Sequence, residues 1–165
     1  MIHRATAMIE KAFQDSGIEC RVLEHDVFSA VAVETTTEGG REFEVVFLSW
    51  TETNAVHVYM DNLLGPFRPS RREKVLEACN KLNRGRFFRY YLGDNGCIGA
   101  AAEIPTATDD ACLGKCCIEI LERARTGIDA KLDVILENVS NEKREPDAEQ
   151  VLAMLRELRE TPLRG

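Results

Sequence analysis

The sequence lacks the features that mark membrane-spanning and exported proteins. No apolar run approaches the roughly 20 residues that a transmembrane helix needs, and the amino terminus has no signal-peptide pattern. A basic cluster is missing as well, since the formal net charge is -7 and the sequence pI is about 5.1. Nucleic acids and anionic membranes attract clustered positive charge. We therefore expect a cytoplasmic protein that binds neither.

A recognisable catalytic set is also missing. A hydrolase needs a nucleophile on a strained turn beside a positioned histidine, whereas Ser29 and Ser49 lie in strand-like segments without a G-x-S-x-G motif. His57 alternates with Val56 and Val58, which is typical of an exposed strand residue. No pair of acids has a spacing that suggests glycosidase or aspartyl chemistry. The sequence therefore predicts no enzyme and no catalytic residues.

Glycine spacing does not predict a phosphate-binding loop. Gly93, Gly96 and Gly99 are evenly spaced, but the residues after them form a strand and offer no helix amino terminus to a phosphate. Gly114 and Lys115 lack the upstream glycine of a P-loop. We interpret the first set as a hairpin turn and expect no cofactor.

The cysteines predict packed thiols rather than a disulfide framework, because nothing indicates a secretory context. Cys112 and Cys116 lie one helical turn apart, yet no second pair completes a zinc site and the three histidines follow no ligand spacing. We expect no metal. A redox role stays open, since a helix amino terminus can lower the pKa of a thiol such as Cys112. The six cysteines are Cys20, Cys79, Cys97, Cys112, Cys116 and Cys117.

The apolar pattern along the 165 residues predicts one α+β domain at residues 1–137. Residues 3–17 have helical spacing, and residues 18–64 alternate with a period of two, which predicts an antiparallel meander of three strands and a fourth around residues 20–23. Ser70 and Glu73 fit a capping box at the start of a second helix that closes at Gly85. RFFRYYL and CIGAAAEI then form a hairpin, and the small residues of its second strand would allow another backbone or helix to lie close. A long helix follows from residue 108 to about 136, so the predicted order is α-β-β-β-(β)-α-β-β-α with the helices packed on the sheet.

Residues 138–147 read as a polar linker, and residues 148–160 as a short amphipathic helix. Such a helix is marginal alone in water, so it must dock on its own domain, pair with a second chain, or fray. In the hairpin, Phe87, Arg89 and Tyr91 alternate with Phe88, Tyr90 and Leu92, so one of these faces lies in the core. We predict that the partner-binding or dimer surface includes Phe88, Tyr90, Leu152, Leu155 and Leu158.

The junction EACNKLNRGRFFRYYLGDNG joins a helix directly to an aromatic strand. Asn80 and Asn83 lie one turn apart just before the break, where asparagine side chains can satisfy backbone groups freed at a helix end. Gly85 ends the helix, and Gly96 provides the positive φ of a tight hairpin. We therefore predict that these four residues have a structural role.

The segment from Ser70 to Ile135 resembles the YbjN family of small bacterial proteins, which are described as sensory transduction regulators. The resemblance rests on Asn80-Lys-Leu-Asn83, the step into RFFRYYL, the Asp94-Asn-Gly96 turn and AAAEIP before the long helix, and the order of elements extends it to about residues 1–137. The cysteine-rich CLGKCC helix departs from the family pattern. The resemblance implies a fold similar to the type III secretion chaperones, which are small, acidic, usually dimeric proteins that bind extended segments of partners.

Two functional hypotheses follow. The first is a non-enzymatic, homodimeric interaction module, chaperone-like or adaptor-like, that binds a partner polypeptide through its sheet or an apolar groove. The alternative is a small-molecule or thiol-responsive regulator that uses the helix at residues 112–117 or a pocket beside the hairpin at residues 86–104.

Overall fold

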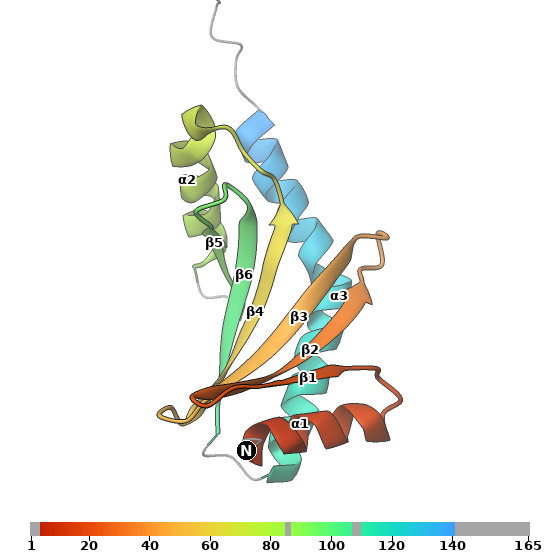
Figure 1. Cartoon of the computed structure of the whole chain (residues 1–165). Coiled ribbons are helices and arrows are strands. Elements are labelled where there is room, and N and C mark those ends of the chain that lie inside the picture. The colour runs from red at the N-terminus through yellow and green to blue at the C-terminus, as the bar shows by residue number, and fades with distance from the viewer. Residues whose placement is uncertain (1–3, 85–86, 107–109, 141–165) are drawn as a thin grey trace, which may run out of the picture.

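The computed structural model describes residues 4–84, 87–106 and 110–140 (Figure 1). Gly85, the predicted linker beyond residue 140 and the predicted helix at 148–160 with Leu152, Leu155 and Leu158 lie outside the described residues. No helix within the described ranges is long and apolar enough to cross a membrane.

The described chain is an α+β unit whose element order agrees with the prediction, including the additional first strand. It contains three α-helices, six strands and one short 3₁₀ helix, η1. In chain order the elements are α1 (Arg4–Asp15), β1 (Arg21–Glu24), β2 (Phe28–Thr36), β3 (Glu42–Trp50), β4 (Ala55–Leu64), η1 (Pro69–Arg71), α2 (Arg72–Leu82), β5 (Arg89–Leu92), β6 (Ile98–Pro105) and α3 (Asp110–Ser140).

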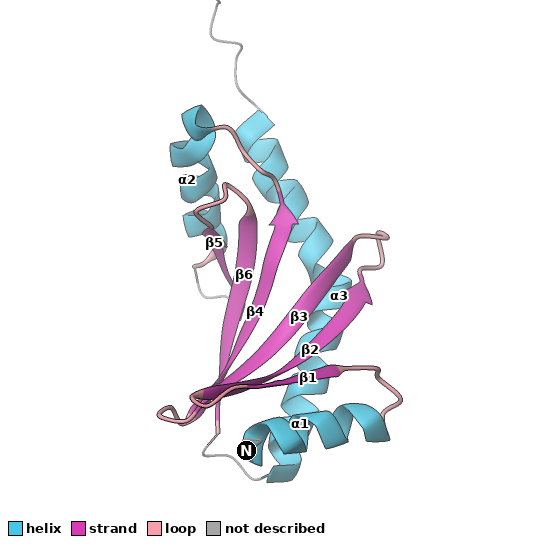
Figure 2. Cartoon of the chain, viewed as in Figure 1, coloured by secondary structure: helices cyan, strands magenta, loops and turns pink. Residues whose placement is uncertain are grey.

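All six strands form one antiparallel sheet in the order β1-β2-β3-β4-β6-β5. The first four strands are a simple meander. The later hairpin then adds β6 to β4, so β1 and β5 are the edges. Figure 2 shows the strands fanning out from one end of the sheet, as the right-handed twist of adjacent strands requires.

One face of the sheet and the three helices build the core. Val31, Val45 and Phe47 occupy alternate strand positions and are fully buried, and the Phe13 ring of α1 meets the Phe47 ring edge-on at a centroid distance of 5.3 Å. Figure 1 shows α3 passing behind the sheet and α2 beside β5. The predicted apolar stripe of α3 is buried along its length and comprises Leu113, Cys117, Ile120, Leu121, Ala124, Ile128, Leu132 and Ile135.

Two predicted boundaries are wrong. Residues Pro69–Arg71 form the 3₁₀ helix, so Ser70 lies before the N-cap position of α2, which Arg71 occupies without a side-chain capping hydrogen bond. The Ser70–Glu73 capping box is therefore absent. At the other end of the domain, α3 continues to Ser140, past its predicted end at about residue 136 and into the predicted linker, because Val139 is still buried in the core.

Candidate protein-binding face

The sheet face opposite the core forms a surface that we call the outer face. In an antiparallel pair, directly opposed residues point to the same side, and the register places Leu23, Ala30, Leu48 and His57 in one row across β1 to β4. Among the described elements, no helix lies in front of β3 and β4 in the view of Figure 1. The apolar or aromatic members of the outer face are Leu23, Phe28, Ala30, Ala32, Val46, Leu48, Trp50, His57, Tyr59 and Ala101.

An aromatic cluster lies at one end of the outer face. The indole of Trp50 is 40% exposed and tilts against the ring of its cross-strand partner Phe28 at a centroid distance of 5.3 Å. His25 stacks on the other side of Phe28 at 4.8 Å. Leu23, on edge strand β1, is also exposed. Exposed large apolar side chains that cluster in this way are typical of an interaction site.

The other end of the outer face carries charge. The guanidinium of Arg21 donates a hydrogen bond to Glu34 at 3.1 Å and another to Glu44. Two carboxylates therefore surround one cation, and this end of the face has a net negative charge. The side chains of Arg21 and Glu34 are largely exposed, so the pairs contribute little to stability and mainly define the local charge.

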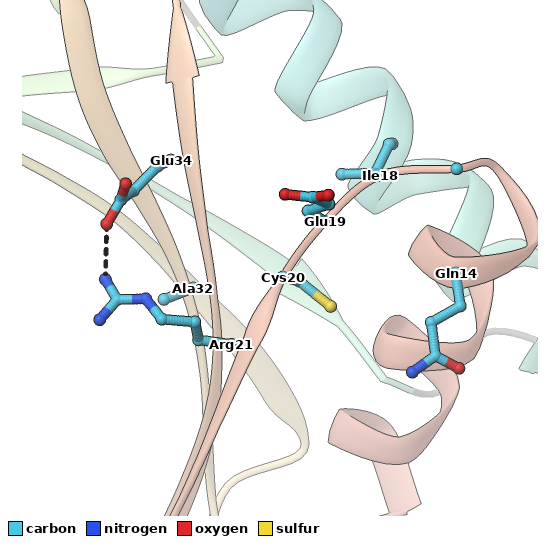
Figure 3. A pocket seen from close by; sticks show the side chains of 8 residues that line it. Gln14, Ile18, Glu19, Cys20, Arg21, Ala32 and Glu34 are labelled. Carbon is cyan, nitrogen blue, oxygen red and sulfur yellow. Dashed lines mark hydrogen bonds and ion pairs between the residues drawn. The ribbon is translucent and has the colours of Figure 1, made fainter.

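A wide groove with a volume of about 680 Å³ lies next to this charge cluster, between the end of α1 and edge strand β1. Figure 3 shows its residues on both sides of the strand: Cys20 lies toward Gln14 of α1, whereas Arg21 and Glu34 lie on the far side. The polar groups of the groove therefore do not converge on one point. The groove widens the surface at the β1 edge but does not have the geometry of an enclosed small-molecule site.

The opposite edge of the sheet is closed by Asn83. Its amide nitrogen Nδ2 donates to the carbonyl oxygen of Tyr90 at 2.8 Å, and the Tyr90 amide donates to Asn83 Oδ1 at 2.7 Å. The carboxamide thus occupies both backbone positions that Tyr90 presents at the outer edge of β5. Asn83 thus binds backbone groups of strand β5 rather than those freed at the helix end, while Asn80 is exposed on α2 one turn earlier.

The hairpin turn is also as predicted. Gly96 has a φ of 78°, and its amide donates to the carbonyl oxygen of Gly93 at 3.0 Å.

The space above Gly99 is filled by an aromatic side chain and not by the backbone or helix that the sequence predicted: a Cβ at this position would lie 2.5 Å from the Tyr91 ring. The Tyr91 hydroxyl donates to Asp61. Burial and this hydrogen bond raise the pKa of Tyr91 well above its usual value.

The hairpin does not expose the residues that were predicted for partner binding. Phe88 is 9% and Tyr90 4% exposed, and both belong to the core. The reason is register, because Tyr90 lies opposite Ala100, which itself lies opposite Met60 on the inner face. Phe87 is the exposed aromatic residue here, with the Arg123 guanidinium 5.7 Å from its ring centroid.

The outer face was missed from the sequence. Its signal is visible in β2 and β3, where Ala30 and Ala32 or Val46 and Leu48 supply apolar residues at the positions that alternate with the core. A sheet with only one covered face usually places polar residues at such positions. Apolar residues on both sides of a strand therefore indicate either a second layer or an interaction surface.

The cysteines differ in exposure. All six are free thiols; Cys79 and Cys117 are buried and Cys112 is exposed. Burial raises the pKa of the Cys79 thiol to about 11 and that of Cys117 further. Burial, together with the hydrogen bond to Cys112, also raises the pKa of Cys116. Within the described residues, no group of three or more His, Cys, Asp or Glu side chains is placed to hold a metal ion.

A small apolar cavity of about 240 Å³ lies between the hairpin and the first half of α3. Cys116 forms part of its wall, and Glu119 and Arg123 lie at its polar side, joined by a 2.6 Å ion pair. This is the pocket beside the hairpin that the second hypothesis requires. Its apolar walls are Phe87, Ile104, Pro105 and Ile120.

No family model, no curated protein and no solved structure matches this chain. The resemblance to the YbjN family and the chaperone-like assignment of the fold therefore stay predictions. What the structure itself establishes is the α+β architecture with its single six-stranded antiparallel sheet.

Proposed function

We propose that this protein is a non-enzymatic protein-binding module whose outer face receives a partner polypeptide. The observation that carries the proposal is the row of apolar side chains on β1 to β4 that no described element covers. Trp50 and Phe28 give this row a rigid aromatic anchor. Large aromatic side chains of this type supply much of the binding free energy at protein interfaces.

The charges around the outer face favour a partner segment that combines apolar side chains with basic flanks. Glu34 and Glu44 outnumber Arg21 at one end of the face, and the whole chain carries a net charge of -7. Complementary charge of this kind mainly accelerates association and selects the partner. Asn83 occupies the Tyr90 positions of the β5 edge, whereas no described strand pairs with the outer side of β1, so we place a strand added by the partner on β1.

A photo-crosslinking amino acid at Leu48 tests this proposal in cells that contain the full chain. We expect crosslinks from Leu48 to a second polypeptide with a basic, apolar segment, identified by mass spectrometry, and none from the same probe at Val134, which is 39% exposed on α3. Trp50→Glu should abolish the crosslink. The matched control is Leu76→Glu, since Leu76 of α2 is 38% exposed and lies away from the sheet. Equal crosslinking from Leu48 and Val134 would contradict the proposal.

The predicted homodimer is tested with the same variants. Light scattering over a wide concentration range should show a dimer for the wild-type chain and for both Trp50→Glu and Leu76→Glu. If Trp50→Glu alone converts dimers to monomers, a second copy covers the outer face and the partner assignment is wrong.

The small-molecule alternative is favoured by one observation, the apolar cavity beside Cys116. A ligand that binds only the native state raises the melting temperature. A compound that stabilises the wild-type protein but not an Ile120→Trp variant, which fills the cavity, would support this function. A screen that yields no such compound under reducing or oxidising conditions would reject it.

A further inference from the structure

The thiols of exposed Cys112 and half-buried Cys116 on α3 have a spacing that suits a bound ion better than a disulfide. Cys112 Sγ and Cys116 Sγ lie 3.9 Å apart across one turn of the helix. Cβ atoms four residues apart on a helix are about 5–6 Å from each other, whereas a disulfide needs roughly 3.5–4.5 Å. The pair therefore cannot form an S–S bond of about 2.05 Å unless the helix distorts.

Two thiolates that share one cation need a different separation. With metal–sulfur bonds of about 2.3 Å, the two sulfurs lie roughly 3.8 Å apart at a tetrahedral angle and roughly 4.6 Å apart in a linear arrangement. The observed 3.9 Å lies close to the tetrahedral value, and rotation of the two side chains, without movement of the backbone, can widen it toward the linear value. The helix holds both sulfurs on one face, because residues four apart are neighbours on its surface.

The surroundings restrict the kind of cation. No third side chain of the described residues joins the pair to form a metal-binding group, which disfavours zinc because a zinc site needs four ligands or three and a water. Thiolate ligands select soft cations, of which copper(I) accepts as few as two sulfurs. Cys116 also forms part of the wall of the apolar cavity lined by Phe87, Pro105 and Ile120, so one side of the pair is apolar, whereas Cys112 on the other side is exposed to solvent.

We propose that Cys112 and Cys116 form a two-thiolate site for a soft monovalent cation of the copper(I) type. On binding, each thiol loses its proton to solvent and each sulfur donates an electron pair to the cation, so two protons are released and no group is oxidised or reduced. This site goes beyond the proposed function and does not depend on the outer face, which lies on other elements.

Anaerobic titration of the reduced full-length protein with copper(I), in competition with a chromogenic copper(I) chelator, tests the site. We expect one copper(I) per chain and a thiolate-to-copper absorption in the ultraviolet. Cys112→Ser and Cys116→Ser should each weaken binding on the order of 100-fold. Cys97→Ser is the matched control, because Cys97 is half-buried like Cys116 but lies in the hairpin turn, and it should bind as the wild type does.

Alkylation mapped by mass spectrometry provides an independent measurement. Copper(I) should protect Cys112 and Cys116 from iodoacetamide and leave the labelling of Cys97 unchanged. Retention of wild-type affinity by the Cys112→Ser/Cys116→Ser double variant would overturn the proposal. A disulfide between Cys112 and Cys116 that forms under mild hydroperoxide treatment would also overturn the proposal, provided that circular dichroism shows α3 to be intact. It would show that the pair is spaced for a disulfide.

Discussion

Asn83 makes two hydrogen bonds to the backbone of Tyr90, one through each polar atom of its carboxamide. The side chain thereby takes the place of a neighbouring strand at Tyr90 of the β5 edge. It also joins the end of α2 to the start of the hairpin across only a few residues. The sharp step from helix to aromatic strand in the sequence is explained by this contact.

Replacing Asn83 by Asp should destabilise the protein, because a carboxylate accepts the Tyr90 amide but cannot donate to the Tyr90 carbonyl. An unsatisfied, partly buried carbonyl costs about 1–3 kcal/mol. Urea unfolding should show this loss, while Asn80→Asp, which changes an exposed residue of the same helix, should stay within about 0.5 kcal/mol of wild type. Equal effects at the two positions would contradict the bridging role of Asn83.

Asp129 of α3 should make stability depend on pH in the acid range. Its carboxylate accepts hydrogen bonds from the Gly39 amide at 3.1 Å and from Arg41 Nε at 3.0 Å, and so ties the β2–β3 turn to the helix. Hydrogen bonds from Thr37, Arg41 and Gly39 lower the pKa of Asp129. A lowered folded-state pKa stabilises the protein above the unfolded-state pKa of about 3.9, and this stabilisation is lost as the pH falls through the folded-state pKa.

The measurement is urea unfolding of wild type and Asp129→Asn between neutral and acid pH. The variant should be less stable by about 1 kcal/mol near neutrality, since the pairs are partly exposed. The difference should shrink as the pH falls below about 4. Asp133→Asn, on the same helix, provides the control; a pH-independent difference for Asp129→Asn would refute the charge argument.

Ser49 should be replaceable by alanine without loss of stability. Its hydroxyl oxygen is buried and has no hydrogen-bond partner among the described residues, whereas its cross-strand neighbour Ser29 shares a 2.6 Å hydrogen bond with Thr6. Removing an unsatisfied buried hydroxyl relieves a desolvation cost of about 1–3 kcal/mol. We expect a raised melting temperature for Ser49→Ala and a lowered one for Ser29→Ala. The reverse order would show that Ser49 is satisfied in solution.

Thiol reactivity should follow exposure along the chain. Cys112 is exposed and should react with a disulfide reagent first, while Cys79 and Cys117 should react only on unfolding, because they are buried and their pKa values are raised. Timed labelling with mass spectrometric identification gives the order. Fast labelling of Cys117 in the native protein would mean that α3 opens readily from the sheet.

The spacing of apolar residues was enough to predict the order of elements, because apolar residues recur every second position in a strand and about every 3.6 positions in a helix. The stripe of α3 and the additional strand β1 were predicted on this basis, and the positive φ of Gly96 followed from turn chemistry. The predicted start of α2 at Ser70 and the predicted end of α3 at about residue 136 were wrong, because a local 3₁₀ turn and the burial of Val139 are set by tertiary packing.

The candidate site could not be predicted in the same way. Alternation showed that Phe88 and Tyr90 share one face of their strand, but only the pairing of β6 with β4 decides that this face is the core. Likewise, the apolar residues Val46 and Leu48 have the same pattern whether a helix covers them or not. The amino-acid sequence by itself determined which side chains lie together along each strand, because that depends on local backbone geometry. Which of the two faces meets the helices, and which no described helix covers, was decided by the tertiary structure, because it depends on contacts between segments far apart in the chain.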